Sequence, residues 1–272
     1  MLRTRIVTAL IGFLVAVFSI REGGYLFNGI LGVLALIGWH EYLTMMRKKR
    51  IPIDVLWGYV TFLMTMICFA LQLYTTAVFV GILMALRIAT SYIFSPLRTA
   101  SMRMAYSLFG VFYVGTAFAV MIVMRDSAFY AGTDAALLPD SGQSVIWLLF
   151  FSVWASDTFA YFAGRLWGKR KIVPLISPNK TLEGYVGGFI GSVITALCCI
   201  FFTGLPLSWG IGAGLLVGIF APLGDLFESK LKRTAGVKDS GMLLPGHGGV
   251  LDRFDSLLFA APAVFAVLML LK

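Results

Sequence analysis

Residues 207–228 read LSWGIGAGLLVGIFAPLGDLFE, and residues 250–271 read VLDRFDSLLFAAPAVFAVLMLL. Each run is mostly apolar over about 20 residues, which is the length an α-helix needs to cross the hydrocarbon core of a bilayer. In lipid the backbone polar groups must be satisfied within the segment itself, as they are in a helix. The two runs therefore predict a pair of membrane-spanning helices joined by the polar stretch 229–249.

Seven further apolar runs precede this pair, at residues 5–20, 25–40, 55–74, 75–94, 104–124, 145–164 and 184–203. The composition of the 272 residues agrees, because 59% are apolar and only 13% are charged, against about 25% charged residues in soluble domains. We therefore expect an all-α integral membrane protein with about nine transmembrane helices, in which residues 1–272 form a single polytopic domain.

The distribution of Lys and Arg predicts the orientation in the membrane. Alternate ends and loops carry 18 of these residues on one side and 3 on the other, and cytoplasmic loops are the ones enriched in them. This places the amino terminus and the loops 165–183 and 229–253 in the cytoplasm, and the carboxyl terminus outside. The net charge of +9 is then explained by topology, so we expect no nucleic-acid partner.

Acidic residues lie in the predicted spans or at their ends: Asp157, Asp225, Glu228, Asp252 and Asp255. A central charge costs about 2.5–3.5 kcal/mol on insertion scales, and the predicted orientation puts all five in the cytoplasmic third of the bilayer. The last four form two i, i+3 pairs, and two such pairs on neighbouring helices could enclose Mg²⁺. The alternative is ion pairing with Lys230, Lys232 or Arg253, and for Asp157 a hydrogen bond to Ser152 or Ser156.

Two basic loops flank these acids. The connection 229–249 combines four cations with a glycine-rich turn around His247. This composition suits a polyphosphate, because glycine lets backbone N–H groups approach it and lysines neutralise its charge. His247 could contact a ligand or donate a proton, although a lone loop histidine more often does neither. In the other loop, Ser177-Pro178 predicts a helix N-cap and first turn before Lys180-Thr181.

The run from Ser229 to Asp255 resembles the hallmark of phosphatidate cytidylyltransferases (CDP-diacylglycerol synthases). That hallmark reads Ser-x-apolar-Lys-Arg, four residues, Lys-Asp-x-small, two residues, apolar-Pro-x-His-Gly-Gly, two residues, Asp-Arg-x-Asp. Every specified position is met over 27 residues. The stretch from Ser177 to Gly184 is similar to a second element of that family, with Asn179 in place of its commonly basic residue.

The resemblance implies an enzyme that joins CTP and phosphatidate into CDP-diacylglycerol and pyrophosphate, with Mg²⁺ as cofactor and a second cation left open. The catalytic residues it implies are Asp225, Asp252, Lys230 and His247. The substrate-binding residues would be Lys180, Thr181, Lys232, Arg233, Lys238 and Asp239. The metal ligands would be Asp225, Asp252, Asp255 and Asp157.

We expect the amino-terminal helices, residues 1–130, to provide the scaffold and lipid access, and residues 145–272 to carry out catalysis. The expected location is the plasma (inner) membrane of a bacterium, with the active site facing the cytoplasm. A homodimer is one oligomeric state that the sequence allows. Two alternatives remain: a CTP-dependent kinase of polyprenol-type lipids, and a transporter. Transport sites usually lie near the midplane, whereas these acids gather at one face.

Overall fold

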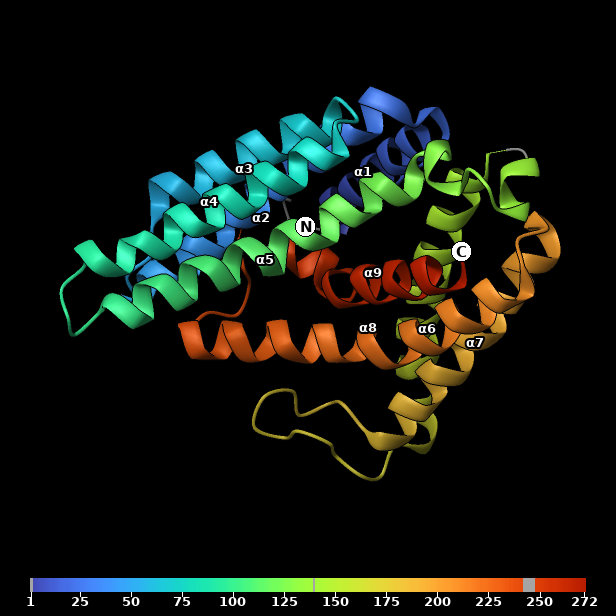
Figure 1. Cartoon of the computed structure of the whole chain (residues 1–272). Coiled ribbons are helices and arrows are strands. Elements are labelled where there is room, and N and C mark those ends of the chain that lie inside the picture. The colour runs from blue at the N-terminus through green and yellow to red at the C-terminus, as the bar shows by residue number, and fades with distance from the viewer. Residues whose placement is uncertain (1, 139, 242–247) are drawn as a thin grey trace. The chain divides into compact units, whose positions relative to one another are not determined.

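The computed structural model describes residues 2–138, 140–241 and 248–272, and these ranges are almost entirely helical (Figure 1). The α-helices are α1 (Leu2–Glu22), α2 (Gly24–Lys48), α3 (Val55–Ala70), α4 (Tyr74–Phe94), α5 (Ala100–Arg125), α6 (Ser141–Trp167), α7 (Leu182–Thr203), α8 (Leu207–Ala235) and α9 (Leu251–Leu271). Two short 3₁₀ helices, η1 (Ser127–Tyr130) and η2 (Asp134–Leu137), precede α6. The described ranges contain no β-strand, so the all-α class is confirmed.

Each predicted apolar run coincides with one of these helices over most of its length. Seven of them, α2 and α4 to α9, are long and apolar enough to cross a membrane. Helix α3 has 16 residues, fewer than the roughly 20 that a span requires, and α1 is not among the seven. The chain is therefore a multi-pass membrane protein, while the count of nine spans and the orientation of the termini stay predictions.

Two helices extend well beyond the predicted runs. Helix α2 continues to Lys48 rather than ending at residue 40, and α8 continues to Ala235 rather than ending at residue 228. Hydropathy marks where apolar character ends, whereas a helix ends where its backbone hydrogen bonds end. As a result, Glu41 is helical, and so are the cations Lys230, Lys232 and Arg233 that were assigned to a loop from the sequence.

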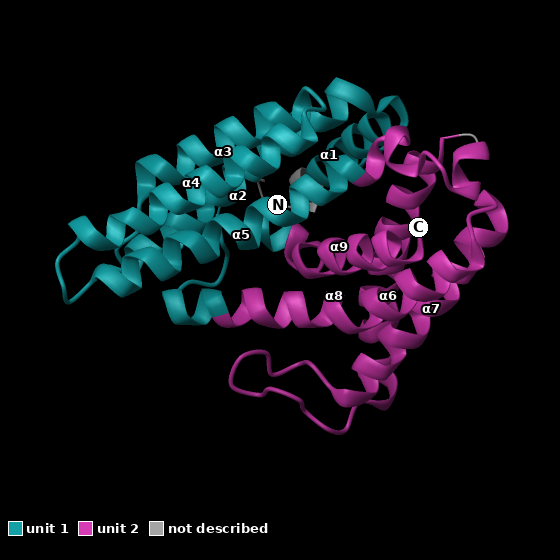
Figure 2. Ribbon diagram, in the orientation of Figure 1, with its two compact units in different colours: residues 1–123, 231–253 teal, residues 124–230, 254–272 magenta. Residues whose placement is uncertain are grey.

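The contacts divide the chain into two compact units, coloured in Figure 2. Unit 1 contains residues 1–123 and 231–253, and unit 2 contains residues 124–230 and 254–272. Helices α8 and α9 each contribute residues to both units. The proposed functional division into residues 1–130 and 145–272 stays a prediction.

In unit 1, α2 packs against α3, which packs against α4. Trp39 and Tyr42 of α2 are fully buried, and the Trp39 ring stacks on Phe62 with centroids 5.3 Å apart. Gly58 and Gly110 lie directly against these two rings, where an added Cβ atom would overlap the Trp39 or the Tyr42 side chain. This packing fixes the part of α2 that carries His40 and Glu41.

In unit 2, α6 packs along α7, and glycines allow their backbones to approach. A Cβ atom on Gly188 of α7 would lie 2.7 Å from the carbonyl oxygen of Ser156 in α6. A Cβ atom on Gly214 of α8 would lie 2.9 Å from the Cα atom of Val193 in α7. Small residues at these positions permit tight helix packing. The glycines of α7 face α6, and those of α8 form the contact between α7 and α8.

Candidate functional site

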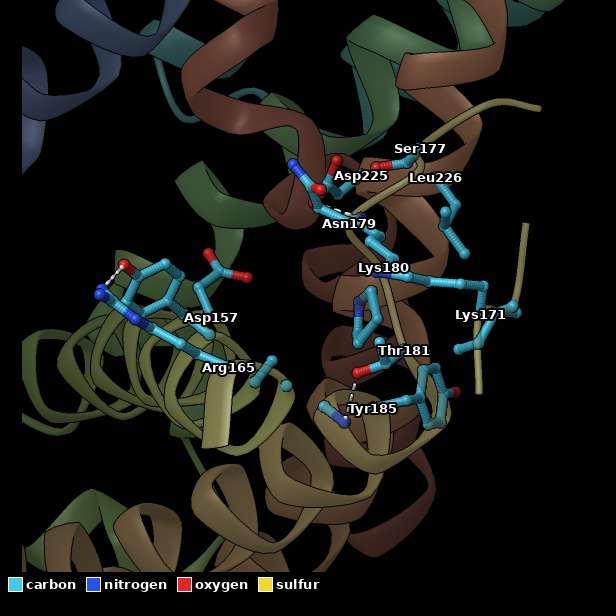
Figure 3. A pocket seen from close by; sticks show the side chains of 16 residues that line it. Asp157, Arg165, Lys171, Ser177, Asn179, Lys180, Thr181, Tyr185, Asp225 and Leu226 are labelled. Carbon is cyan, nitrogen blue, oxygen red and sulfur yellow. Dashed lines mark hydrogen bonds and ion pairs between the residues drawn. The ribbon is translucent and has the colours of Figure 1, made fainter. Parts of the chain in front are cut away.

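A cavity of about 550 Å³ lies in unit 2 between α6, the loop before α7, and α8 (Figure 3). Its size falls within the roughly 300–1,000 Å³ of small-molecule sites. The charged side chains that line it are Asp157, Arg165, Lys171, Lys180 and Asp225. The cavity therefore places three cations and two carboxylates of the described residues around one space.

The two carboxylates come from different helices. Asp157 projects from α6 and is exposed to the cavity, and Asp225 projects from α8 beside it. The ammonium group of Lys180 forms an ion pair with Asp225, and the hydroxyl of Ser256 donates a hydrogen bond to Asp157. The partner of Asp157 is thus Ser256 of α9. The hydroxyls of Ser152 and Ser156 are buried and bond to no described residue.

The loop that supplies the cations is folded back on itself. Backbone hydrogen bonds join Leu182 N to Arg170 O at 2.8 Å and Ile172 N to Lys180 O at 3.2 Å, around an isolated β-bridge between Lys171 and Thr181. The carboxylate of Glu183 accepts from the backbone N–H groups of Lys169 and Arg170. These bonds hold both lysines of the bridge region, at positions 171 and 180, at the cavity.

The predicted helix start at Ser177-Pro178 is wrong. Helix α7 begins at Leu182, and its N-cap is Thr181, whose Oγ1 atom accepts a hydrogen bond from Gly184 N at 3.2 Å. Thr181 is a favourable N-cap residue, and Glu183 follows it in the first turn, where an acid is stabilised. Ser177 instead lines the cavity, and the buried hydroxyl of Thr181, predicted to bind substrate, caps the helix.

A second cluster lies in unit 1, around Asp252 at the start of α9. One oxygen, Oδ1, accepts from Lys232 Nζ at 2.6 Å. The other, Oδ2, accepts from Ser240 N at 2.9 Å, Ser240 Oγ at 3.0 Å and Gly249 N at 2.8 Å. Because the Asp252 side chain is only 8% exposed and both oxygens are engaged, the ion pair with Lys232 that the sequence offered as an alternative is present.

Glu41 of α2 also belongs to this cluster, although it was not among the residues predicted from the sequence. Its side chain is buried, and it accepts hydrogen bonds from Ser240 Oγ at 3.0 Å and from the backbone N–H groups of Val250 and Leu251 at 2.9 Å. The first N–H groups of a helix lack intrahelical partners and attract negative charge. The signal in the sequence is an acidic residue one position after a predicted apolar run, followed directly by Tyr42 and Leu43.

Glycines make room for this carboxylate. A Cβ atom on Gly241 or on Gly249 would lie 2.5 Å from Glu41 Oε1. Gly248 has a φ of 84°, which favours glycine, and its Cβ atom would lie 2.6 Å from Asp252 Oδ2. The glycines described in this predicted phosphate-binding segment therefore lie close to the carboxylates of Glu41 and Asp252.

The remaining predicted residues lie outside the two clusters described above. Lys230, Arg233, Lys238 and Asp239 are exposed. Asp255 accepts from the N–H of Ser256 at 2.7 Å, Glu228 is fully buried, and His247 lies outside the described residues. Among the described residues, no three His, Cys, Asp or Glu side chains converge on one point. The metal site with four carboxylate ligands therefore stays a prediction. Two of the four predicted ligands, Asp157 and Asp225, line the same cavity.

Membrane-crossing helices together with a cavity that combines cations and carboxylates define a polytopic membrane protein with a site suited to a phosphate-bearing ligand. Comparison with known sequences identifies the family to which this membrane protein belongs. The chain belongs to the cytidylyltransferase family, whose sequence model matches residues 3–271.

Curated relatives are similar over nearly the whole chain. The phosphatidate cytidylyltransferase of Staphylococcus aureus (strain COL) is 35% identical, covering 98% of this chain and 99% of its own. Those of Staphylococcus haemolyticus and Staphylococcus epidermidis are 36% and 35% identical over the same shares. The similarity therefore includes both units.

We predict that Glu41→Gln lowers the free energy of unfolding by about 1–3 kcal/mol, because an amide replaces a carboxylate that faces only N–H and O–H donors. Thermal unfolding of the purified protein in detergent measures this loss. We also expect faster tryptic cleavage after Lys238, since the segment next to Ser240 would lose its anchor.

Glu22→Gln is the matched control, because Glu22 is exposed at the end of α1. The control should unfold like the original protein. If Glu41→Gln were equally stable and equally resistant to trypsin, Glu41 would not anchor this segment.

Proposed function

We propose that the protein transfers CMP from CTP to phosphatidate, which yields CDP-diacylglycerol and pyrophosphate. The observation that carries this proposal is the similarity to curated phosphatidate cytidylyltransferases over 98% of the chain. The enzyme is a nucleotidyltransferase that acts on a lipid, and a multi-pass protein suits a substrate that resides in the bilayer.

The unit 2 cavity is the site we assign to the nucleotide. Its volume of about 550 Å³ suits a small molecule, and Arg165, Lys171 and Lys180 supply positive charge for a triphosphate. Lys180 pairs with Asp225 across this cavity, so a bound phosphate oxygen would compete with that carboxylate for the lysine.

The residues of this cavity fit a magnesium ion. Mg²⁺ is usually held by one or two carboxylates together with waters and substrate phosphate oxygens, and Asp157 and Asp225 are two carboxylates that face the same space. When bound, the ion would neutralise charge on the phosphates of the nucleotide. Asp255, which also belongs to unit 2, remains a proposed ligand of this ion. Asp252 remains a proposed ligand of a second cation, and it would have to release Lys232 to serve as one.

The reaction needs positioning and charge stabilisation more than a covalent nucleophile. An oxygen of the phosphatidate phosphate forms a bond to the α-phosphorus of CTP, and the bond from that phosphorus to the departing pyrophosphate breaks. Exposed cations of the predicted set are available to the phosphate groups: Lys230, Arg233 and Lys238. Lys232 pairs with Asp252 within unit 1. His247, which lies outside the described residues, remains a predicted catalytic residue, and Asp239 remains a predicted substrate-binding residue.

We place the active site at the cytoplasmic face of the bacterial inner membrane, where CTP is available. The basic segments that carry the site support this orientation, since cytoplasmic loops are enriched in Lys and Arg. A homodimer remains part of the proposal.

With purified protein, Mg²⁺ and phosphatidate, label from α-labelled CTP should enter the lipid and label from γ-labelled CTP should not. The reason is that only the CMP portion is transferred. Lipid labelled from the γ-position would instead indicate a lipid kinase, and uptake into vesicles without consumption of CTP would indicate a transporter.

Asp225→Asn should reduce this α-label transfer by at least about 100-fold and should raise the Mg²⁺ concentration required, because one of the two cavity carboxylates is lost. Asp134→Asn provides the matched control, since Asp134 is exposed in η2, far along the chain from the cavity residues. Near-normal turnover in Asp225→Asn at low Mg²⁺ would contradict the metal assignment.

Thr234→Cys tests the orientation in a background without Cys68, Cys198 and Cys199, because Thr234 is exposed near the end of α8. A membrane-impermeant maleimide should label this cysteine in inverted vesicles and not in intact cells. Ala136→Cys, exposed in η2 on the predicted outer side, should give the reverse result. Labelling of Thr234→Cys in intact cells would contradict a cytoplasmic active site.

A further inference from the structure

Arg87 places a positive charge within a membrane-crossing helix of unit 1. It lies in α4, which is one of the candidate spans, seven residues before the helix ends at Phe94. At 1.5 Å per residue, this is about 10 Å from the end of the helix. An ionisable residue inside a span is costly and points to a function. Arg87 belongs neither to the unit 2 cavity nor to the cluster around Asp252.

The contacts of the Arg87 guanidinium group are with neutral groups. Its central carbon lies 4.2 Å from the centroid of the Trp57 ring in α3, and its Nη1 atom donates to Thr90 Oγ1 at 3.2 Å. Among the residues that the structure describes, Arg87 forms no ion pair. Asp54, which precedes α3, pairs instead with Arg103 at 3.8 Å, and its side chain is only 5% exposed. No described carboxylate therefore neutralises Arg87.

The geometry places the guanidinium group near one end of the span. Side chains of a helix tilt toward its amino end, yet the Arg87 side chain reaches Thr90, one turn toward the carboxyl end. Trp57 is the third residue of α3, which packs along α4 (Figure 1). Tryptophan is enriched at membrane interfaces, and long cationic side chains extend toward the headgroups there. The pair of Arg87 and Trp57 thus lies at the depth of lipid phosphates.

The surface next to this pair is apolar on the side of the bilayer interior. Leu83 lies one turn before Arg87 on the same face of α4, and its side chain is 60% exposed. Leu86, which directly precedes Arg87, is 59% exposed. Along α4, exposed apolar side chains are therefore followed by one cation. A phospholipid has the same order of groups, with acyl chains followed by a phosphate.

We propose that Arg87 and Trp57 bind one anionic phospholipid of the surrounding bilayer through its phosphodiester group, with an acyl chain along Leu83. A guanidinium group has several N–H donors in one plane, and pairs of them bond phosphate oxygens side by side. The Trp57 ring covers a face of that plane and leaves the N–H groups at its edge available. This inference goes beyond the proposed function and does not depend on it.

The charge of the site favours a phosphodiester over other lipid headgroups. One guanidinium group balances the single negative charge of a phosphodiester. A phosphate monoester such as that of phosphatidate carries about 1.5 to 2 negative charges, so part of its charge would stay unbalanced. A zwitterionic headgroup would bring a second cation close to Arg87. An anionic phosphodiester lipid such as phosphatidylglycerol therefore fits best.

The test is lipid retention, measured by native mass spectrometry of the purified protein in detergent without CTP. The probes are dioleoylphosphatidylglycerol and dioleoylglycerol, which has the same acyl chains and no phosphate. The original protein should retain the first at mole fractions that give no retention of the second. Arg87→Gln should need about 10-fold more phosphatidylglycerol, the usual scale of a lost hydrogen bond to a charged group. Arg87→Lys keeps the charge without the planar donors and should lie between the two.

Arg98→Gln is the matched control, because Arg98 is exposed in the loop that follows α4 and the substitution removes the same charge from the same end of the helix. It should retain phosphatidylglycerol like the original protein. Trp57→Leu should weaken retention as well, since it removes the ring against which the guanidinium group stacks. Thermal unfolding in lipid-free detergent shows whether each variant is folded.

The proposal is overturned if the original protein retains phosphatidylglycerol and dioleoylglycerol equally, a comparison that needs no variant. Equal losses in Arg87→Gln and Arg98→Gln would also overturn it, because they would report only the general surface charge. Retention of phosphatidate in preference to phosphatidylglycerol, lost in Arg87→Gln, would assign the site to a phosphate monoester and contradict the proposal. Failure of the proposed function would appear separately, as absence of α-label transfer from CTP to lipid.

Discussion

The buried carboxylate of Glu41 is the interaction on which the arrangement of unit 1 depends. It accepts hydrogen bonds from Ser240, about 200 residues away in the sequence, and from the first amides of α9. Burial of a charge is costly unless donors compensate it, and here three donors and the amino-terminal end of a helix do so. The result joins α2 to both ends of the segment that connects α8 with α9.

The same physical reason explains two ion pairs, Lys180–Asp225 in unit 2 and Lys232–Asp252 in unit 1. A site for phosphates and a cation needs ammonium groups and carboxylates, and each kind of charge is expensive close to the hydrocarbon core. Pairing them lowers that cost while the groups stay close together. In unit 2 the paired side chains remain 25% and 31% exposed. In the proposed nucleotide site, a phosphate group would therefore replace the carboxylate as the partner of Lys180.

The helices were predictable because apolar runs of this length and composition form membrane-spanning helices, and a helix overlaps each run. The ends of the helices were less predictable. Helix α2 continues through His40 and Glu41 because tertiary contacts bury the Glu41 carboxylate, and hydropathy contains no information on such contacts. In the candidate site, Asp157, Lys180 and Asp225 were predicted from the sequence and line one cavity, while their roles stay predictions. Glu41 and Ser256 were missed because their roles come from contacts with residues distant in the sequence.

The central claim, that Glu41 and Ser240 act together to hold the connecting segment, is tested most directly by a double-mutant cycle. Glu41→Gln, Ser240→Ala and the double variant would be compared by their unfolding free energies in detergent. We predict a coupling energy of about 1 kcal/mol or more, within the range measured for residues in direct contact. Additive effects, with a coupling energy below about 0.3 kcal/mol, would contradict the account.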